Sequence, residues 1–168
     1  MKIGAPVLRE RKLNRKRGYD YSSPGAYFVT ICVHGRMRKE PVFGSISNGT
    51  MSLNEWGTVA VRYWEEIPDH YDNVRLDEYC VMPDHIHGII WIVGAMTVGD
   101  VPVRTEQCSV LTGTLSKIIK SFKNAVTKHI GKSIWQRSYY DRIIRDNDEL
   151  YRIREYIKRN PKNWGNDV

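Results

Sequence analysis

The chain has 168 residues, of which 41% are hydrophobic and 27% charged, and its formal net charge is +7. This length predicts one domain, and the composition excludes a wholly disordered chain. No apolar run approaches the roughly 20 residues that a transmembrane helix needs, so we expect no membrane span.

The first 25 residues are polar and basic, which predicts an N-terminal arm (1–25) ahead of a single domain (26–168). The first strand of that domain is expected at 26–33, where β-branched and aromatic residues follow one another. A hairpin is expected next, because the Asn48-Gly49 turn separates two short extended segments within residues 41–53.

Apolar residues then recur at helical spacing, which predicts a helix at 55–67. Asn54 is a plausible N-cap for this helix, and Pro68 follows the end of the pattern. Two apolar segments, 74–82 and 86–93, predict an antiparallel pair of strands joined by a short turn.

Residues 94–109 lack periodicity and are expected to form one long loop, a kind of segment that tends to be functional or mobile. A second amphipathic helix is predicted at 113–129. Of the segments 134–136 and 141–145, one is expected to be a strand, and the pattern leaves open which of them it is.

The last helix is predicted to begin near Asp146, with Glu149 in a loose capping box. It is expected to end by Asn160, because Pro161 disfavours a helical conformation in the residue before it. The order strand, hairpin, helix, strand, strand, helix, strand, helix fits an α+β fold of ferredoxin-like type, an antiparallel sheet with two helices on one face.

Charge is segregated along the chain. Residues 1–18 hold seven basic side chains against one acidic, residues 54–80 hold seven acidic against two basic, and residues 110–145 hold eight basic against one acidic. This pattern predicts an acidic side and a basic side, and a polyanion such as a nucleic acid is the natural partner of the basic side. Solvated faces without a ligand are the alternative, above all for the basic arm.

The cysteines indicate a reducing compartment. Cys32, Cys80 and Cys108 are an odd number without CxxC spacing, which argues against a disulfide framework or a cysteine zinc site. The N-terminal apolar stretch is also too short and interrupted for a secretory signal, so we expect a cytoplasmic protein.

His85 and His87 open an apolar strand, and residues two apart in a strand point to the same face. Two neutral imidazoles side by side predict a metal or phosphate site, although such a pair can also occur by chance. The remaining histidines (His34, His70 and His129) are scattered and are interpreted as structural or surface residues. The residues alone therefore leave a third ligand open among Asp, Glu, Asn and Gln.

Tyr156 and Asn160 are one helical turn apart and share a face that is rotated away from the apolar stripe of the last helix. A tyrosine in this place is most often a packing residue at the helix edge. The segment 135–140 mixes aromatic and cationic residues, which suits stacking on bases with phosphate contact and equally suits a corner of the core.

As an ordered set, several segments over about residues 14–164 resemble the REP-associated tyrosine transposases, a branch of the single-tyrosine HUH transposases. The segments are GYDY at 18–21, GAYFVTIC at 25–32, LNEWG at 53–57, WEEIP at 64–68, MPDHIHGII at 82–90, SFK at 121–123, WQRSYYD at 135–141 and RIREYIKRNP at 152–161.

This resemblance implies a ferredoxin-like nuclease fold that binds single-stranded DNA next to a hairpin. His85 and His87 match the histidine pair that holds Mg²⁺ or Mn²⁺ in the family, and Tyr156 matches the nucleophile. Asn160 stands where related transposases carry a glutamine ligand, one methylene longer. Two imidazoles by themselves would instead favour Zn²⁺ or another late transition metal.

The activity implied is cleavage and rejoining of DNA through a covalent 5′-phosphotyrosine, by a monomer or homodimer associated with the nucleoid. DNA-backbone contacts are expected from basic residues of the arm and of the 115–145 region: Arg15, Lys16, Arg17, Lys117, Lys120, Lys123, Arg137 and Arg142. Two alternatives remain: a metal-dependent nuclease in which water attacks, and a domesticated module that binds a DNA or RNA hairpin through a vestigial site.

Overall fold

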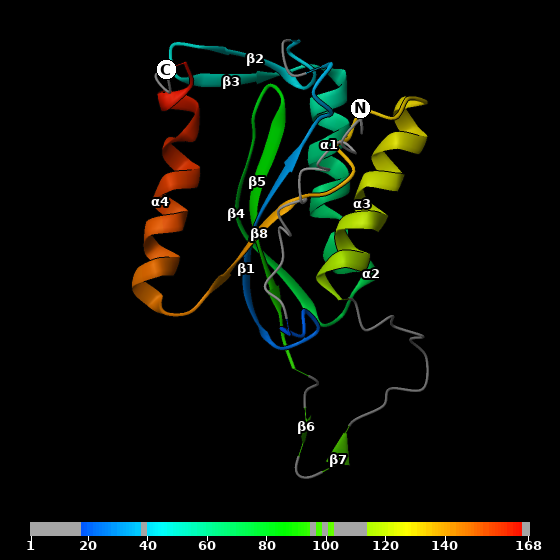
Figure 1. The fold of residues 1–168 in the computed structure, drawn as a ribbon, viewed down its shortest axis with the longest axis vertical. Helices are drawn as coiled ribbons and strands as arrows, with labels where there is room; N and C mark the ends of the chain where they lie inside the picture. The colour runs from blue at the N-terminus through cyan, green and yellow to red at the C-terminus, as the bar shows by residue number, and fades with distance from the viewer. Residues whose placement is uncertain (1–17, 38–39, 95–96, 99–100, 103–113, 166–168) are drawn as a thin grey trace, which may run out of the picture.

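A four-stranded antiparallel sheet forms the centre of the fold (Figure 1). In the computed structural model, which describes residues 18–37, 40–94, 97–98, 101–102 and 114–165, the strands lie in the order β4-β5-β1-β8. Their bounds are β1 (Gly25–Cys32), β4 (Val74–Val81), β5 (His85–Ile92) and β8 (Tyr140–Ile144). The predicted strand pair at 74–93 is therefore present, and of the two ambiguous segments it is the second that forms a strand.

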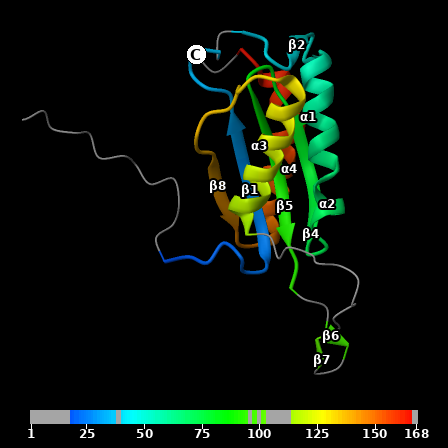
Figure 2. The same cartoon turned by 90° about the vertical axis from the view of Figure 1, so that its right-hand side faces the viewer.

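Helices cover both faces of this sheet. Figures 1 and 2 show α1 (Glu55–Glu65) and α3 (Leu115–Ile130) on one face and α4 (Asn147–Asn163) on the other. Without α4, the order of strands and helices around the sheet is that of the ferredoxin-like fold, so the predicted fold class is confirmed. Placement of the last helix on the opposite face is a finding that the sequence pattern does not predict.

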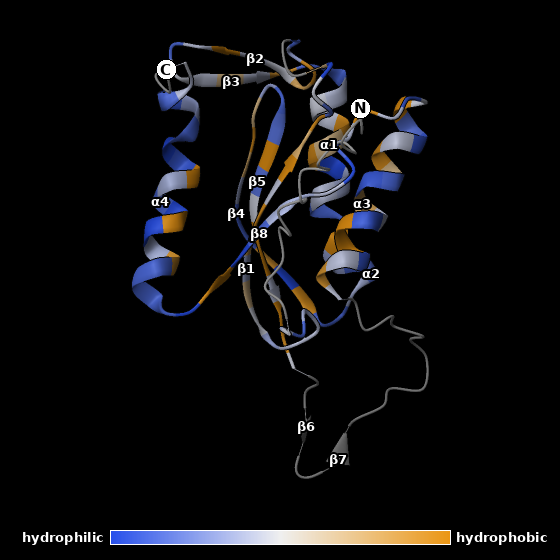
Figure 3. Cartoon of the chain, in the orientation of Figure 1, coloured by the Kyte–Doolittle hydropathy of each residue, from blue (hydrophilic) through white to orange (hydrophobic). Residues whose placement is uncertain are grey.

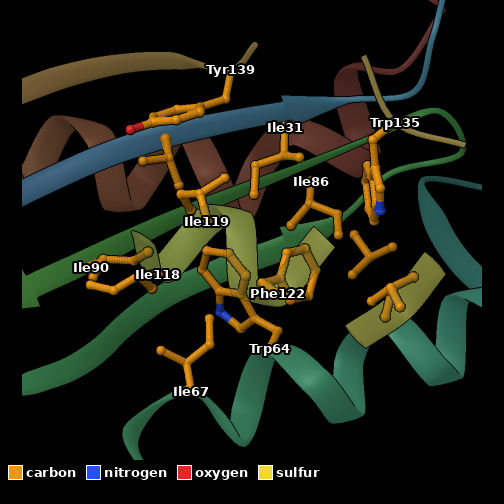
Figure 4. Close-up of a cluster of buried hydrophobic side chains, with 14 of the residues drawn as sticks. Ile31, Trp64, Ile67, Ile86, Ile90, Ile118, Ile119, Phe122, Trp135 and Tyr139 are labelled. Carbon is orange, nitrogen blue, oxygen red and sulfur yellow. The ribbon is translucent and has the colours of Figure 1, made fainter. Parts of the chain in front are cut away.

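Two hydrophobic clusters separate the layers. The larger cluster lies between the sheet and the pair α1 and α3, and includes Trp64 and Phe122 (Figure 4). A smaller cluster lies under α4 and consists of Ala26, Ile89, Leu150, Ile153 and Ile157. Because β5 contributes to both clusters, its residues are apolar on both faces, which explains why it reads as a nearly continuous apolar run.

Backbone geometry accounts for the predicted hairpin between β2 (Gly44–Ser47) and β3 (Thr50–Leu53). Asn48 and Gly49 both have positive φ angles, 53° and 71°, as a two-residue hairpin turn requires. A Cβ atom added at Gly49 would lie 3.2 Å from Cγ of Lys162. The tip of the hairpin therefore touches the C-terminal part of α4.

The predicted N-cap of α1 is present in the structure, but the predicted ends of two helical regions are wrong. The Asn54 side chain accepts a hydrogen bond from the Gly57 backbone at 2.9 Å, as predicted. Pro68, expected outside the helical region, belongs to a short helix, α2 (Ile67–His70), where proline is tolerated in the first turn. The predicted end of α4 at Asn160 is also wrong: the helix continues through Pro161, which costs only one backbone bond so near the end of the helix.

The segment expected to be one long loop contains a short two-stranded ladder, β6 (Thr97–Val98) with β7 (Val101–Pro102). Much of this segment, and residues 1–17 of the predicted arm, lie outside the described residues. Figure 3 shows α3 and α4 as largely hydrophilic helices with short hydrophobic stretches. None of the helices in the described ranges combines the length and apolar character needed to span a membrane.

Candidate active site

The two histidines predicted as a pair face α4 from the first residues of β5. Their Nε2 atoms are 3.0 Å apart. The other ring nitrogen of each histidine has its own partner: His85 Nδ1 lies 2.6 Å from Asp84 Oδ1, and His87 Nδ1 lies 2.8 Å from Thr30 Oγ1. Because a carboxylate only accepts hydrogen bonds, His85 carries a proton on Nδ1, and its Nε2 is left with a lone pair when the ring is neutral.

Burial keeps His87 neutral. Its side chain lies under α4 and stacks on Phe28. Desolvation, with the nearby His85 as a second cause, lowers the pKa of His87 to about 3. A neutral imidazole is the form that binds metals, so this environment keeps His87 available as a ligand.

Tyr156 approaches the pair from α4. Its hydroxyl oxygen is 3.4 Å from His87 Nε2, and its ring packs edge-on against Phe28 and His87. The side chain is 49% exposed, so the hydroxyl is next to the imidazoles and still accessible. The structure thus brings together two residues 69 positions apart that the sequence could associate only through a family resemblance.

A set of charged contacts holds α4 over β4. Arg154 forms two hydrogen bonds to Asp77, at 2.8 and 2.6 Å, and Trp91 Nε1 donates a third at 2.9 Å. The bond from Arg154 is the main cause that lowers the pKa of Asp77 to about 2. One turn later, Lys158 pairs with Glu78 at 3.1 Å.

Our sequence analysis did not find this docking arrangement. The available signal was the i, i+4 spacing of Arg154 and Lys158 on α4, opposite two adjacent carboxylates on β4. A β-bulge between Leu76 and Tyr79 interrupts the regular register of β4 at those carboxylates.

The pair can hold one cation, but it needs further ligands. Two nitrogens 3.0 Å apart can both lie about 2.1 Å from one ion, at about a right angle. In the part of the chain that the structure describes, no group of three or more His, Cys, Asp or Glu side chains is arranged to hold a metal. Asn160 is half-buried one turn after Tyr156, and its predicted role as an amide ligand stays a prediction.

The basic residues predicted to contact DNA fall into separate places. Lys117 and Lys120 are exposed on α3, on the face of the sheet opposite to the histidines. Arg137 is exposed before β8, and Arg142, on β8, pairs with the buried Glu149 at 2.6 Å. Arg15, Lys16 and Arg17 lie outside the described residues.

Lys123 has a structural role in the fold. Its ammonium group donates to the backbone carbonyls of Gln136 and Ser138, at 2.9 and 3.0 Å. Burial lowers the pKa of Lys123 to about 8. Two of the three donors of the ammonium group therefore hold the segment before β8.

The fold and the site together define a ferredoxin-like domain with a paired-histidine site and a tyrosine presented by the C-terminal helix. Residues 53–160 match the sequence profile described as "Transposase IS200 like", and the chain belongs to this family. The chain is therefore a member of a transposase family, as the sequence comparison with REP-associated tyrosine transposases predicted.

Two curated proteins and one solved structure are similar to this chain. An uncharacterized Haemophilus influenzae protein is 36% identical over 95% of this chain and 93% of its own length. A second H. influenzae protein, provisionally named a REP-associated tyrosine transposase, is 26% identical over 87% of this chain and 75% of its own. A solved REP-associated tyrosine transposase bound to a REP hairpin shares the fold, with a TM-score of 0.63 and 17% identity over 90% of this chain and 74% of that one.

Proposed function

We propose that this chain is a metal-dependent transposase that cleaves and rejoins single-stranded DNA next to a hairpin, with Tyr156 as the nucleophile. The observation that carries the proposal is the 3.4 Å distance between the Tyr156 hydroxyl and Nε2 of His87. A tyrosine placed only for packing would not need to present its hydroxyl to a buried, neutral imidazole that is paired with a second one.

His85 and His87, with Asn160, would hold the divalent cation, Mg²⁺ or Mn²⁺. Such an ion supplies charge stabilisation to a phosphate that gains negative charge during displacement. Asp84 and Thr30 fix the orientation of the two rings, and second partners of this kind tune the ligands they contact. Burial keeps His87 in its ligand form.

The bond changes follow from a tyrosine attacking a phosphodiester. The Tyr156 hydroxyl gives up its proton to solvent and its oxygen bonds to phosphorus. The bond from phosphorus to the 3′ oxygen breaks, and that oxygen takes up a proton from solvent. The products are a 5′-phosphotyrosine and a free 3′-hydroxyl. When a 3′-hydroxyl attacks the phosphotyrosine, the tyrosine leaves and the strand is rejoined without an external energy source.

Single-stranded DNA beside a hairpin is the substrate that the similarity supports best, because the solved structure with this fold is bound to a REP hairpin. The contacts we propose for the DNA backbone are the exposed Lys117, Lys120, Arg137 and Arg142, together with the basic N-terminal residues. Phosphate contacts position DNA, so the hairpin itself would supply the specificity.

The test is covalent capture. Wild-type protein, mixed with Mn²⁺ and single-stranded hairpin oligonucleotides from its own genomic flanks, is expected to give a protein–DNA band that survives a denaturing gel. Tyr156→Phe is expected to abolish that band, because it removes only the attacking oxygen. His87→Ala and a chelator are expected to abolish it as well.

Each alternative gives a different result. Cleaved DNA with free ends and no covalent band in the wild type would assign the attack to water. Hairpin binding that is insensitive to the chelator and to His87→Ala, without cleavage, would make the chain a binding module. A covalent band that persists in Tyr156→Phe would refute Tyr156 as the nucleophile.

A further inference from the structure

We propose that Tyr140 is a stacking platform for a nucleobase of the single-stranded substrate, at the edge of the sheet beside the histidine pair. The proposal rests on the proposed function in one respect, that the ligand is single-stranded DNA. The proposal adds to that function one protein–DNA contact and the direction in which the DNA strand leaves the active site, which is across β1 and β8.

The strand register places Tyr140 level with the site. Tyr140 is paired with Thr30, and Thr30 is paired with His87, so the three residues form one row across β8, β1 and β5. Directly paired residues of antiparallel strands project to the same face. Tyr140 therefore lies on the same face as the histidines, two strand spacings or about 10 Å from His87.

The aromatic residues of the 135–140 segment differ in how much of each side chain is exposed. Trp135 and Tyr139 are 8% and 9% exposed and belong to the main core, whereas Tyr140 is 47% exposed. Figure 4 shows Trp135 and Tyr139 among the core side chains. Trp135 and Tyr139 are therefore core residues, and Tyr140 is the aromatic residue of this segment that is free to stack on a base.

Contacts to the residues before Tyr140 hold the backbone in place and so limit the movement of the Tyr140 ring. Lys123 binds the carbonyls of Gln136 and Ser138, and buried Tyr139 anchors the next position. A ring that is already held in place loses little conformational entropy when a base stacks on it.

The open side of the sheet gives the direction of the DNA strand. Toward β4 the sheet is covered by α4, whose Arg154 and Lys158 pair with Asp77 and Glu78. Toward β8 the same face carries the exposed side chains of Tyr140 and Arg142. Arg142 pairs with Glu149, but a guanidinium group has five N–H donors, so it can contact a phosphate while it keeps that partner. The DNA backbone is therefore directed over β8.

The experiment measures binding without chemistry. All variants are made in the Tyr156→Phe protein, and the probes are DNA hairpins that carry a short thymidine tail, on the 5′ side or on the 3′ side. Matched probes carry the same tail with abasic sugars, which keeps every phosphate and removes every base.

We expect Tyr140→Ala to weaken binding to at least one thymidine-tailed probe by about 5- to 160-fold, the range found for one stacked base. The same substitution is expected to change binding to the abasic probe by less than about 2-fold, because no base is present to stack. Tyr140→Phe keeps the ring and is expected to bind like the parent. Tyr151→Ala is the control, since Tyr151 is an exposed tyrosine on α4, 65% accessible.

Equal binding of Tyr140→Ala and its parent to both thymidine probes would overturn the proposal. An equal loss on thymidine and abasic probes would also overturn it, because the effect would then be structural or electrostatic. These outcomes are distinct from failure of the proposed function, which is judged by the covalent band. Stacking without a covalent band would leave a binding module that uses Tyr140, and a covalent band without stacking would leave the transposase without this contact.

Discussion

At the scale of single residues, the histidine pair depends on groups that are not ligands. Asp84 holds the proton on Nδ1 of His85, and Thr30 bonds the corresponding nitrogen of His87. These partners hold the rings so that the Nε2 atoms of His85 and His87 face each other, 3.0 Å apart. Removal of either partner leaves its ring free to turn or to move its proton.

We therefore predict that Asp84→Ala weakens Mn²⁺ binding by about 10- to 100-fold, the usual cost of losing a partner of a ligating histidine. The free-ion signal in an electron paramagnetic resonance titration measures this affinity. Asp69→Ala, which removes an exposed carboxylate on α2, is the control and is expected to bind like the wild type. Unchanged affinity in Asp84→Ala would show that His85 does not need this carboxylate.

Gly88 belongs to β5, the strand that carries the two histidines, and faces the core. A Cβ atom placed on it would lie 2.3 Å from Cζ2 of Trp64 and 2.8 Å from Cη2, both atoms of a fully buried indole. We predict that Gly88→Ala lowers the free energy of unfolding by about 1–3 kcal/mol, because the indole cannot move without disturbing the core. Urea unfolding measures the change. Gly35→Ala, which meets nothing within 4 Å, is the matched control.

At the scale of elements, α4 carries the proposed nucleophile and is held to the sheet by one apolar cluster and a few polar contacts. The apolar contact is the smaller cluster. The polar contacts include the two hydrogen bonds from Arg154 to Asp77 and the ion pair between Lys158 and Glu78. Since Tyr156 follows Arg154 by two residues, the ion pair of Arg154 with Asp77 helps to set where the hydroxyl lies.

The ion pair predicts a pH dependence of stability. The pKa of Asp77 is lowered in the folded protein to about 2, from an ordinary value of 3.8, so the folded state favours the carboxylate. Its contribution, on the order of 1–2 kcal/mol, is complete above about pH 4 and is lost as the pH falls toward 2. Asp77→Asn should therefore show a smaller loss of unfolding free energy than wild type across this window in urea titrations. An identical loss in both proteins would contradict the assignment.

At the scale of the whole molecule, the α3 lysines and the candidate active site lie on opposite faces of the sheet. Lys117 and Lys120 project from α3, whereas the histidines and Tyr156 lie under and on α4. A DNA molecule that contacts both sets must therefore reach around the domain.

We predict that Lys117→Gln with Lys120→Gln reduces the salt dependence of hairpin binding. The slope of log K against log salt is expected to fall by about 0.7–0.9 for each phosphate contact that is lost. Binding isotherms at several salt concentrations measure the slope. Arg62→Gln, on α1, removes a cation that is paired with Glu66 and is the control. An unchanged slope in the double variant would make the α3 lysines a solvated face.

Local patterns predicted the local structure well. The Asn48-Gly49 turn and the Asn54 cap are set by neighbours within a few residues, and both are present. The last helix could not be placed on a face from its own pattern, because β5 offers apolar residues on both sides.

The features that the sequence did not predict depend on contacts between residues far apart in the chain. Arg154 and Asp77 are 77 positions apart, and no spacing rule connects them. The row of His87, Thr30 and Tyr140 likewise exists only once the strand register is known. The prediction that Tyr156 lies close to the histidines came from the family resemblance, because no pattern in the sequence alone connects these residues.

The position of α4 after the last strand has an evolutionary consequence. A premature stop codon just after Ile144 would leave all four strands of the central sheet, and both helices on its other face, encoded. It would delete the proposed nucleophile together with the amide at 160, expose the rest of the smaller apolar cluster, and leave Asp77 and Glu78 without their basic partners on α4. One nonsense mutation, followed by a few polar substitutions on the newly exposed surface, would thus be a short route from the proposed transposase to a protein that only binds DNA.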